Sequence, residues 1–214
     1  MNHEADYIER LRTTMVERQI AHRGVTNRRV LDAMARVPRH LFLPGRPPEE
    51  AYADGAVAVG HGQTCSQPYV VAYMTEWCEP SAQDRALEIG TGSGYQAAVL
   101  AELCREVITI ERVEPLAATA RERLDRLGYE NVTVFCDDGY PGYSEGAPFD
   151  IILITAGAPS VPPPLLEQLS EAGRLVAPIG QGTQRITRYT RQFGGLHREN
   201  GLDVRFVPFI TDQQ

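Results

Sequence analysis

From residue 85 onward, short apolar segments alternate with amphipathic ones, and few folds accommodate that alternation. We expect strands in RALEIG, EVITIE, NVTVF, FDIILITA and RLVAPI. We expect helices in YQAAVLAELC, in the segment from Pro115 to Leu127, and in PPLLEQLS, which Gly173 would close. Strands and helices that alternate through short loops are typical of a parallel sheet with helices on both faces. The sequence therefore predicts a doubly wound α/β fold.

The C-terminal segment follows a different pattern. QRITRYTRQF and LDVRFVPF have the composition of strands. The residues between them, 194–201, contain three glycines and one asparagine and are too few for a crossover helix. Strands joined without a crossover pair antiparallel. We therefore expect an antiparallel strand pair at one side of a mostly parallel sheet.

The N-terminal part has helical periodicity. Apolar residues within 8–20 recur at the spacing of one helix face. A second helix is expected to begin with Thr26 as its N-cap and to end at Pro38. The proline-rich stretch 44–62 is expected to be mostly loop, and a further helix is expected after Pro68. These helices predict a small helical subdomain ahead of the sheet.

Composition limits the size and the partners of the fold. The chain has 214 residues, of which 43% are hydrophobic, and this is enough for one sizeable core. We divide it into a helical segment, 1–80, and an α/β core, 81–214, packed as one unit. The formal net charge of −7 argues against binding nucleic acid mainly through phosphates. The charged N-terminus is unlike a signal peptide and no apolar run has membrane-spanning length, so we expect a cytoplasmic protein without membrane contact.

The cysteines and histidines do not form a recognisable metal pattern. Cys65, Cys78, Cys104 and Cys136 include no CxxC pair, and the five histidines include no HExxH motif. Reduced thiols and the lack of a metal site are the corresponding expectations.

A glycine-rich segment, LEIGTGSGY, spans the end of the first expected strand and the start of a helix. Glycines there let the backbone approach a ligand at the carboxyl end of the strand, near the helix N-terminus. The chain has no GxxxxGK[ST] phosphate loop, and its GxGxG spacing differs from the GxGxxG of dinucleotide folds. A tight turn without a ligand is the simpler alternative, but three glycines at alternate positions favour a binding loop.

Acidic residues stand at the ends of three expected strands. Glu88 lies beside the glycine loop, where a carboxylate would repel a pyrophosphate but would suit a cationic amine. Glu111 ends the second strand, where doubly wound folds place the acid that accepts ribose hydroxyls. Asp138 and Gly139 follow the third strand and can face an adenine amino group. A ligand with adenine, ribose and a cationic amino-acid end, but no phosphate, is S-adenosylmethionine.

The chain resembles the protein-L-isoaspartate (D-aspartate) O-methyltransferase family over about residues 15 to 210. The matching segments, in the family's order, are MVERQI, VPRHLFLP, GQTCSQPYVVAYMTE, LEIGTGSGYQAAVLAEL, IERVEPLA, LGYENV, DGY, PFDIILITA and RFVPF. The glycine loop alone would indicate only a class I methyltransferase, whereas GQTxSQP is specific to the family. The resemblance implies a Rossmann-like class I methyltransferase sheet, S-adenosylmethionine as co-substrate and isoaspartyl-containing proteins and peptides as partners. We expect a monomer.

The resemblance also implies the site residues. In this family the serine of GQTxSQP is the active-site residue, which corresponds to Ser66. Two positions depart from the family pattern: Cys65 stands where an aliphatic residue is usual, and Asp137 stands where Gly is usual, so that a charge is added beside the expected adenine contact. The residues expected to bind the methyl donor are Gln63, Thr64, Cys65, Glu88, Gly90, Thr91, Gly92, Ser93, Gly94, Glu111, Arg112, Asp137, Asp138 and Gly139.

The implied reaction needs little acid–base chemistry. A carboxylate is already ionised at pH 7, so alignment with the methyl group and desolvation matter most. The hydroxyl of Ser66 can orient a carboxylate oxygen by donating a hydrogen bond. The implied nucleophile is the free carboxylate of an L-isoaspartyl residue. Its methyl ester would collapse to a succinimide that reopens partly to normal aspartate.

Three alternatives stay open at this point. A carboxyl methyltransferase dedicated to one peptide is disfavoured because no extra C-terminal substrate domain is seen in the sequence. A NAD-dependent oxidoreductase is disfavoured by the GxGxG spacing and by Glu88. A binding module without catalysis is disfavoured by the intact GQTCSQP segment.

Overall fold

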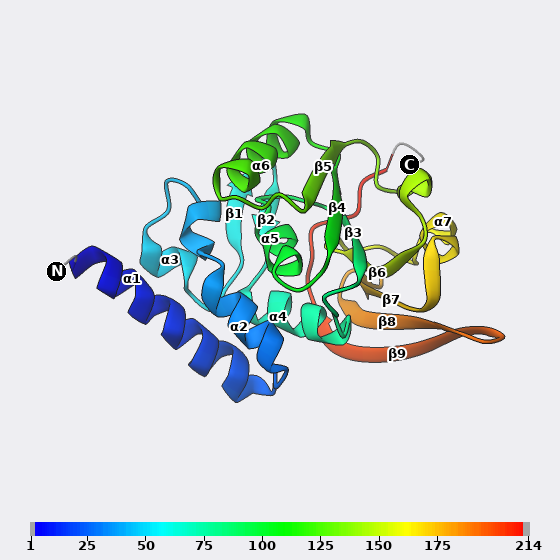
Figure 1. Cartoon of the computed structure of the whole chain (residues 1–214), viewed down its shortest axis with the longest axis horizontal. Coiled ribbons are helices and arrows are strands. Elements are labelled where there is room, and N and C mark those ends of the chain that lie inside the picture. Colours follow the sequence, from blue (N-terminus) through cyan, green and yellow to red (C-terminus); the bar gives the residue numbers. More distant parts are fainter. Residues whose placement is uncertain (1–2, 212–214) are drawn as a thin grey trace.

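A computed structural model describes residues 3–211, and its centre is a seven-stranded sheet (Figure 1). The strand order is β5-β4-β3-β6-β7-β8-β9. Strands β3 to β7 are parallel, and β8 and β9 pair antiparallel at one edge. This confirms the predicted sheet. The strands are β3 (Arg85–Ile89), β4 (Glu106–Glu111), β5 (Val132–Cys136), β6 (Phe149–Ile154), β7 (Leu169–Ile179), β8 (Gln184–Gln192) and β9 (Gly195–Val204).

The remaining elements lie mainly before β3 in the chain. A small two-stranded sheet, β1 with β2, stands apart from the large one. The helices and short strands are α1 (His3–Thr14), a π-helical stretch (Met15–Ile20), a 3-10 turn (Ala21–Arg23), α2 (Arg28–Arg36), a second 3-10 turn (Arg39–Phe42), α3 (Pro48–Ala51), β1 (Val57–Gly60), β2 (Gln63–Cys65), α4 (Pro68–Trp77), α5 (Tyr95–Ala101), α6 (Glu114–Arg126), a third 3-10 turn (Ser144–Gly146) and α7 (Pro163–Glu167).

The two faces of the large sheet are covered unequally. Because strand side chains alternate between faces, Ala86 and Val107 join a buried cluster with α4, α5 and the N-terminal helices. Leu87 and Ile108 point to the opposite face, where the much shorter α7 and Phe209 cover them. Figure 1 shows the N-terminal helices packed on one side of the molecule and the β8–β9 hairpin extending from the other. The first cluster joins residues from both segments, 1–80 and 81–214; their division into two units stays a prediction.

The strand order fixes where a ligand can bind. The chain passes from β3 outward to β4 and β5, and then returns to β6 on the other side of β3. In doubly wound sheets, ligands bind outside the carboxyl ends of the strands where the order reverses. The carboxyl ends of β3, β4 and β6 therefore mark the expected cleft.

The N-cap of α2 is Asn27, and the prediction of Thr26 is wrong by one residue. The Asn27 side chain accepts hydrogen bonds from the backbone N–H groups of Arg29 (3.0 Å) and Val30 (3.4 Å). The backbone N–H groups of Thr26 and Asn27 both donate to the Glu76 carboxylate, at 2.7 and 2.6 Å. This contact with α4 fixes the entry of the chain into α2, and local sequence alone did not reveal it.

The helix predicted to run to Gly173 is also wrong in its second half. Helix α7 ends at Glu167, and β7 begins at Leu169. Leu169 pairs with Phe149 at the start of β6, and a register shift follows before the regular ladder. Pairing with β6 therefore overrides local helix propensity, and Gly173 lies inside a strand.

The loop predicted between the last two strands is short. Strand β9 begins at Gly195, so Asn200 and Gly201 lie within it. A Cβ on Gly201 would clash with the Tyr73 hydroxyl, so the glycine marks close packing against α4. Residues 205–209 leave the strand, because Val207 and Phe209 form backbone hydrogen bonds with Gly157 instead. The whole RFVPF segment therefore lies outside β9.

The stretch 44–62 is more ordered than its prolines and glycines suggested. It contains α3 and β1 in addition to turns. Strand β1 pairs with β2, and the tip between them contains Gly60, His61 and Gly62, all with positive φ. The GQTCSQP segment thus begins as the second strand of a hairpin.

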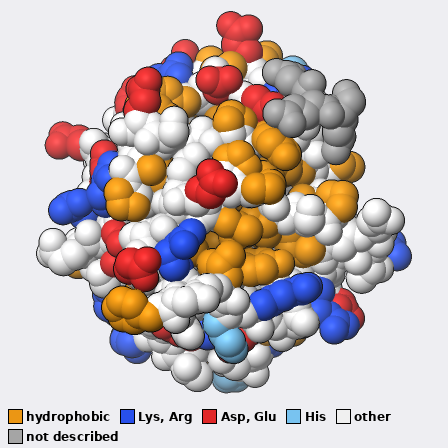
Figure 2. Space-filling view, turned by 90° about the vertical axis from the view of Figure 1, so that its right-hand side faces the viewer, with side chains coloured by type: hydrophobic (Ala, Val, Ile, Leu, Met, Phe, Trp, Pro, Cys, Tyr) orange, Lys and Arg blue, Asp and Glu red, His pale blue; other side chains and the backbone are white. Residues whose placement is uncertain are grey.

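Figure 2 views the molecule toward the side where the β8–β9 hairpin extends. Hydrophobic side chains gather near the centre of this face, and charged side chains of both signs surround them. Among residues 3–211, none of the helices combines the length and the apolar character needed to cross a bilayer.

Candidate active site

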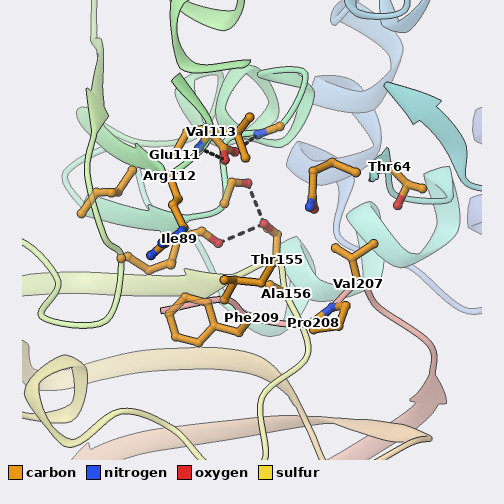
Figure 3. A pocket seen from close by; sticks show the side chains of 16 residues that line it. Thr64, Ile89, Glu111, Arg112, Val113, Thr155, Ala156, Val207, Pro208 and Phe209 are labelled. Carbon is orange, nitrogen blue, oxygen red and sulfur yellow. Dashed lines mark hydrogen bonds between the residues drawn. The ribbon is translucent and has the colours of Figure 1, made fainter. Parts of the chain in front are cut away.

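A cleft lies at the carboxyl ends of β3, β4 and β6, as the strand order predicts. The cleft is partly open, and its empty space of about 610 Å³ includes solvent at the mouth. Figure 3 shows Thr64 facing it from the β1–β2 hairpin, and Ile89 and Thr155 from the strand ends. The lining residues are Gln63, Thr64, Ile89, Gly90, Gly92, Ile110, Glu111, Arg112, Val113, Gly139, Thr155, Ala156, Val207, Pro208, Phe209 and Ile210.

The glycine loop, residues 90–94, approaches this cleft through its backbone. Gly90, Gly92 and Gly94 have φ values of 100°, 53° and 87°, which disfavour residues with a Cβ. A Cβ on Gly90 would also clash with Thr155 Oγ1, which donates to the Gly90 carbonyl (2.6 Å) and can also donate to that of Ile89 (3.0 Å). Gly94 instead packs toward α6 and does not line the cleft. The loop is thus a backbone surface fixed by close packing.

Glu111 connects the end of β4 to the glycine loop. Its carboxylate accepts hydrogen bonds from the backbone N–H groups of Gly92 (2.8 Å) and Val113 (2.9 Å), and both are visible in Figure 3. The side chain is buried, yet it lines the cleft. An ionised carboxylate offers about four lone-pair sites, so roughly two remain for ligand hydroxyls. Glu111 can therefore hold the loop and bind a ribose at the same time.

Glu88 lies behind the glycine loop and does not line the cleft. It is fully buried, and its Oε2 accepts a hydrogen bond from Thr109 Oγ1 at 2.6 Å. The Thr109 hydroxyl is in turn 2.7 Å from that of Thr91 in the loop. Its Oε1 has no hydrogen-bond partner among the residues that the structure describes. Burial is the main cause that raises the pKa of Glu88 to about 8. The expected contact between a Glu88 carboxylate and a ligand amine is not provided by this geometry, because the carboxyl is out of reach and uncharged at pH 7.

The segment after β5 places its glycine, and not its two acids, in the cleft. Asp137 accepts a hydrogen bond from the Asp138 backbone N–H (2.7 Å), and Asp138 accepts one from that of Tyr140 (2.9 Å). Gly139 lines the cleft, and a Cβ on it would clash with Ile89. The two carboxylates shape the turn, and an adenine contact by Asp137 or Asp138 stays a prediction.

Several lining residues were not foreseen from the sequence. Thr155 and Ala156 follow β6, and only the strand order shows that β6 neighbours β3. The segment 207–210 forms another wall because the Gly157 N–H donates to the Val207 carbonyl and the Phe209 N–H donates to the Gly157 carbonyl, both at 2.8 Å. The RFVPF segment was recognised in the sequence, but its strand-like composition predicted a place in the last strand and not in the wall of the cleft.

The Ser66 loop, residues 63–67, separates the first cleft from a second one. Ser66 lines the second cleft together with Arg23, Asp54, Tyr69 and Arg205. It also lines a small cavity beneath the glycine loop, which it shares with Cys65, Thr91 and Ser93. Ser66 therefore lies between the cavity beneath the glycine loop and a surface groove, close to Thr64, which also lines the first cleft.

The Ser66 hydroxyl has no protein partner within residues 3–211. His40 is committed elsewhere, because its Nδ1 lies 2.8 Å from the Tyr52 hydroxyl. Burial is the main cause that lowers the pKa of His40, so its ring is neutral at pH 7. No basic side chain in the described part of the chain forms a hydrogen bond with the Ser66 hydroxyl, which favours hydrogen bonding over nucleophilic attack as its role.

One wall of the second cleft is a polar cluster on the N-terminal segment. Arg23 forms an ion pair with Asp54 at 3.2 Å, and Gln67 donates to the same carboxylate at 2.7 Å. The Arg23 guanidinium also lies 3.7 Å from the centre of the Tyr69 ring. The Arg23–Asp54 ion pair is partly exposed and therefore contributes little to the stability of the fold. Its role is to shape the wall of the groove. Within the described residues 3–211, no group of three or more His, Cys, Asp or Glu side chains is placed to hold a metal ion.

The comparison with known proteins decides the family. The family model described as protein-L-isoaspartate (D-aspartate) O-methyltransferase matches residues 10–214. The chain belongs to this family. A protein-L-isoaspartate O-methyltransferase of Opitutus terrae is 52% identical over 96% of this chain and 91% of its own. One of Geobacter metallireducens is also 52% identical, over 93% of both chains.

Solved protein-L-isoaspartate O-methyltransferases have the same architecture. One superposes with a TM-score of 0.83 and 30% identity over 94% of this chain, which spans 65% of that solved chain. A Plasmodium falciparum protein assigned to the family, in complex with S-adenosyl-L-homocysteine, superposes with a TM-score of 0.81 and 25% identity over 93% of this chain and 98% of its own. The Rossmann-like class I methyltransferase fold that was expected is thereby confirmed.

Proposed function

We propose that this protein methylates the free carboxylate of L-isoaspartyl residues in proteins and peptides, with S-adenosylmethionine as the methyl donor. The observation that carries the proposal is the position of Ser66. Its hydroxyl, which has no partner among residues 3–211, lies between the glycine loop and an open groove. A small donor and a polypeptide substrate can therefore meet at one hydroxyl.

The first cleft fits the donor chemically. The backbone of Gly90 and Gly92 lines the cleft and can approach the amino-acid end, because neither residue has a side chain. Glu111 retains acceptor capacity for the two ribose hydroxyls. Ile89 and Phe209 offer apolar surfaces for a flat base next to Gly139. When bound, S-adenosylmethionine supplies a methyl group on a sulfonium, a strong electrophile for an ionised carboxylate.

The second cleft fits a peptide in an open groove. Its walls come from the N-terminal segment on one side and from residues 202–206 on the other. Arg205 is exposed on the second wall, and no ion pair of its guanidinium occurs within the described residues 3–211. An unpaired cation in the groove favours the approach of an anionic substrate.

The protein's contribution to the reaction is alignment. Ser66 would donate a hydrogen bond to one carboxylate oxygen and leave the other directed toward the donor. Holding two reactants in reactive geometry can contribute roughly 7 to 11 kcal/mol to lowering the barrier. No proton has to be removed from the nucleophile, which agrees with the lack of a base at Ser66. The ester product would close to a succinimide without further help from the enzyme.

We also propose that the protein acts as a cytoplasmic monomer without nucleic acid, in line with its net charge of −7. Action on one dedicated peptide is the remaining alternative. The open groove supports the general reading, since it places no closed pocket around residues that flank the methylated one.

The direct test is a methyl-transfer assay with labelled S-adenosylmethionine. A peptide with one isoaspartyl residue is compared with its aspartyl twin, and several unrelated sequences are used. We expect transfer to every isoaspartyl peptide and none to the twins. Transfer to one sequence only would support the dedicated alternative, and equal transfer to both twins would refute the proposed substrate.

A further inference from the structure

One buried arginine lies directly beneath the Ser66 loop. Arg39 has no exposed surface, and all three of its nitrogens donate hydrogen bonds. Nε donates to the Ala51 carbonyl (2.7 Å), Nη1 to Cys65 Sγ (3.1 Å) and Nη2 to the Ser66 carbonyl (2.8 Å). Two of the three acceptors belong to the Ser66 loop.

The same guanidinium also reaches the end of the glycine loop. It lies 4.7 Å from the centre of the Tyr95 ring, and Tyr95 is the first residue of α5, directly after Gly94. Tyr95 is almost completely buried, so this cation–π contact is shielded from water. One side chain thus contacts the Ser66 loop and the residue that directly follows the glycine loop.

Arg39 has no acidic partner among residues 3–211. A buried charge without a counter-ion is costly, and here its cost is offset by the hydrogen bonds to Ala51, Cys65 and Ser66. The guanidinium is planar, and its donors point in fixed directions that a lysine cannot reproduce. The arrangement therefore holds three acceptors in fixed positions, two of them in the Ser66 loop.

We propose that Arg39 is the positioning residue of the Ser66 loop. By holding the Ser66 carbonyl it fixes the backbone from which the hydroxyl projects, and through Tyr95 it keeps that hydroxyl in register with the glycine loop. This inference rests on the proposed function of Ser66. It assigns Arg39 no contact with the donor or the substrate.

The test is a double-mutant cycle between Arg39→Met and Ser66→Ala, with Arg39→Lys as a milder variant. Both kcat/KM for the isoaspartyl peptide and donor affinity by calorimetry are measured well below the midpoint of unfolding. We expect Arg39→Met to lower kcat/KM about 10- to 100-fold, and Arg39→Lys to lower it less. Donor affinity should change less than about threefold. In the Ser66→Ala background, the further loss from Arg39→Met should be under about threefold.

Arg29, an exposed arginine that also donates to two backbone carbonyls, provides a control. Its guanidinium donates to the carbonyls of Pro80 (2.6 Å) and Leu103 (2.9 Å), away from both clefts. Arg29→Met should lower the unfolding midpoint and leave kcat/KM unchanged. Full additivity between Arg39→Met and Ser66→Ala would overturn the proposal, and so would wild-type turnover in Arg39→Met.

Hydrogen exchange tests the same point without turnover. In Arg39→Lys, the amides of residues 63–67 should exchange faster, while those of residues 85–89 in the central strand should not. Unchanged exchange in 63–67 would refute the positioning role even if the protein proved inactive on isoaspartyl peptides. Inactive wild type with faster exchange in the variant would instead refute only the proposed function.

Discussion

The glycine loop and the Ser66 loop border the same site, but they are held in different ways. The glycine loop owes its path to glycines with positive φ, to a clash-free contact with Thr155, and to the adjacent Glu111 carboxylate. The Ser66 loop has ordinary side chains and is fixed from below by Arg39, a residue 27 positions earlier in the chain. The first loop has glycines of its own that permit its backbone path, whereas residues 63–67 contain no glycine and depend on tertiary contacts alone. Substitutions should therefore affect the two loops differently.

The largest effect is expected from Gly90→Ala. The new Cβ would clash with Thr155 Oγ1 at a φ of 100°. Strain and overpacking together should lower the free energy of unfolding by about 2–5 kcal/mol and abolish measurable donor binding. Urea unfolding and calorimetry measure both. Gly128→Ala is the control, because its φ is +80° but nothing lies within 4 Å of the added Cβ; it should cost only about 1–2 kcal/mol and leave donor binding intact. Equal effects of the two substitutions would show that the contact with Thr155 is unimportant.

Glu111→Ala should weaken donor binding by about 1.5 to 3 kcal/mol, the scale of a lost hydrogen bond to a charged group. The loss should fall near the upper end, because the N–H groups of Gly92 and Val113 also lose their acceptor. Glu111→Gln keeps an acceptor and should lose less. Calorimetric titration with S-adenosylhomocysteine measures the effect, and unchanged affinity in Glu111→Ala would remove Glu111 from the donor site.

Ser66→Ala should lower kcat/KM for an isoaspartyl peptide by about tenfold to somewhat over a hundredfold, which corresponds to about 1.5 to 3 kcal/mol. Donor affinity should survive, since the glycine loop is untouched. Ser66→Thr keeps the hydroxyl but adds a methyl group in a narrow cavity, so its activity should be intermediate. A methylated or acylated Ser66 detected by mass spectrometry during turnover would contradict the orienting role.

Per pH unit, the smallest effect concerns Glu88 behind the glycine loop. Its pKa is about 8 in the folded protein, against 4.5 for an unperturbed carboxyl. Between these values the unfolded chain releases a proton that the folded protein retains, so this contribution to stability is complete below pH 4.5 and is lost as pH rises to 8. The slope is at most about 1.4 kcal/mol per pH unit. Glu88→Gln does not titrate, so urea unfolding from pH 5 to pH 8 should show its stability rising relative to wild type. If the stabilities of wild type and Glu88→Gln changed in parallel with pH, Glu88 would be ionised in the folded protein.

The sequence determined most of the α/β core. Five apolar strands from residue 85 to 179 were predicted from short runs, because a strand buried on both faces must be apolar along its length. The glycine loop and the family were also visible, since both are encoded by neighbouring residues. The prediction failed near Gly173, because the strand there is set by pairing with β6, which is distant in sequence. It also failed at the N-cap of α2, because a contact with Glu76 of α4 fixes the start of the helix at Asn27.

The residues of the site show the same division between what local sequence indicated and what tertiary structure decided. Local sequence indicated Gly90, Gly92, Glu111 and Ser66, because each stands in a motif or at a strand end. Tertiary structure alone decided that Glu88 is buried away from the cleft and that the C-terminal segment 207–210 forms a wall of it. It also placed Arg39 under Ser66. The physical reason is that burial and hydrogen-bond partnership depend on which segments pack together, and a local pattern specifies only the face a residue presents.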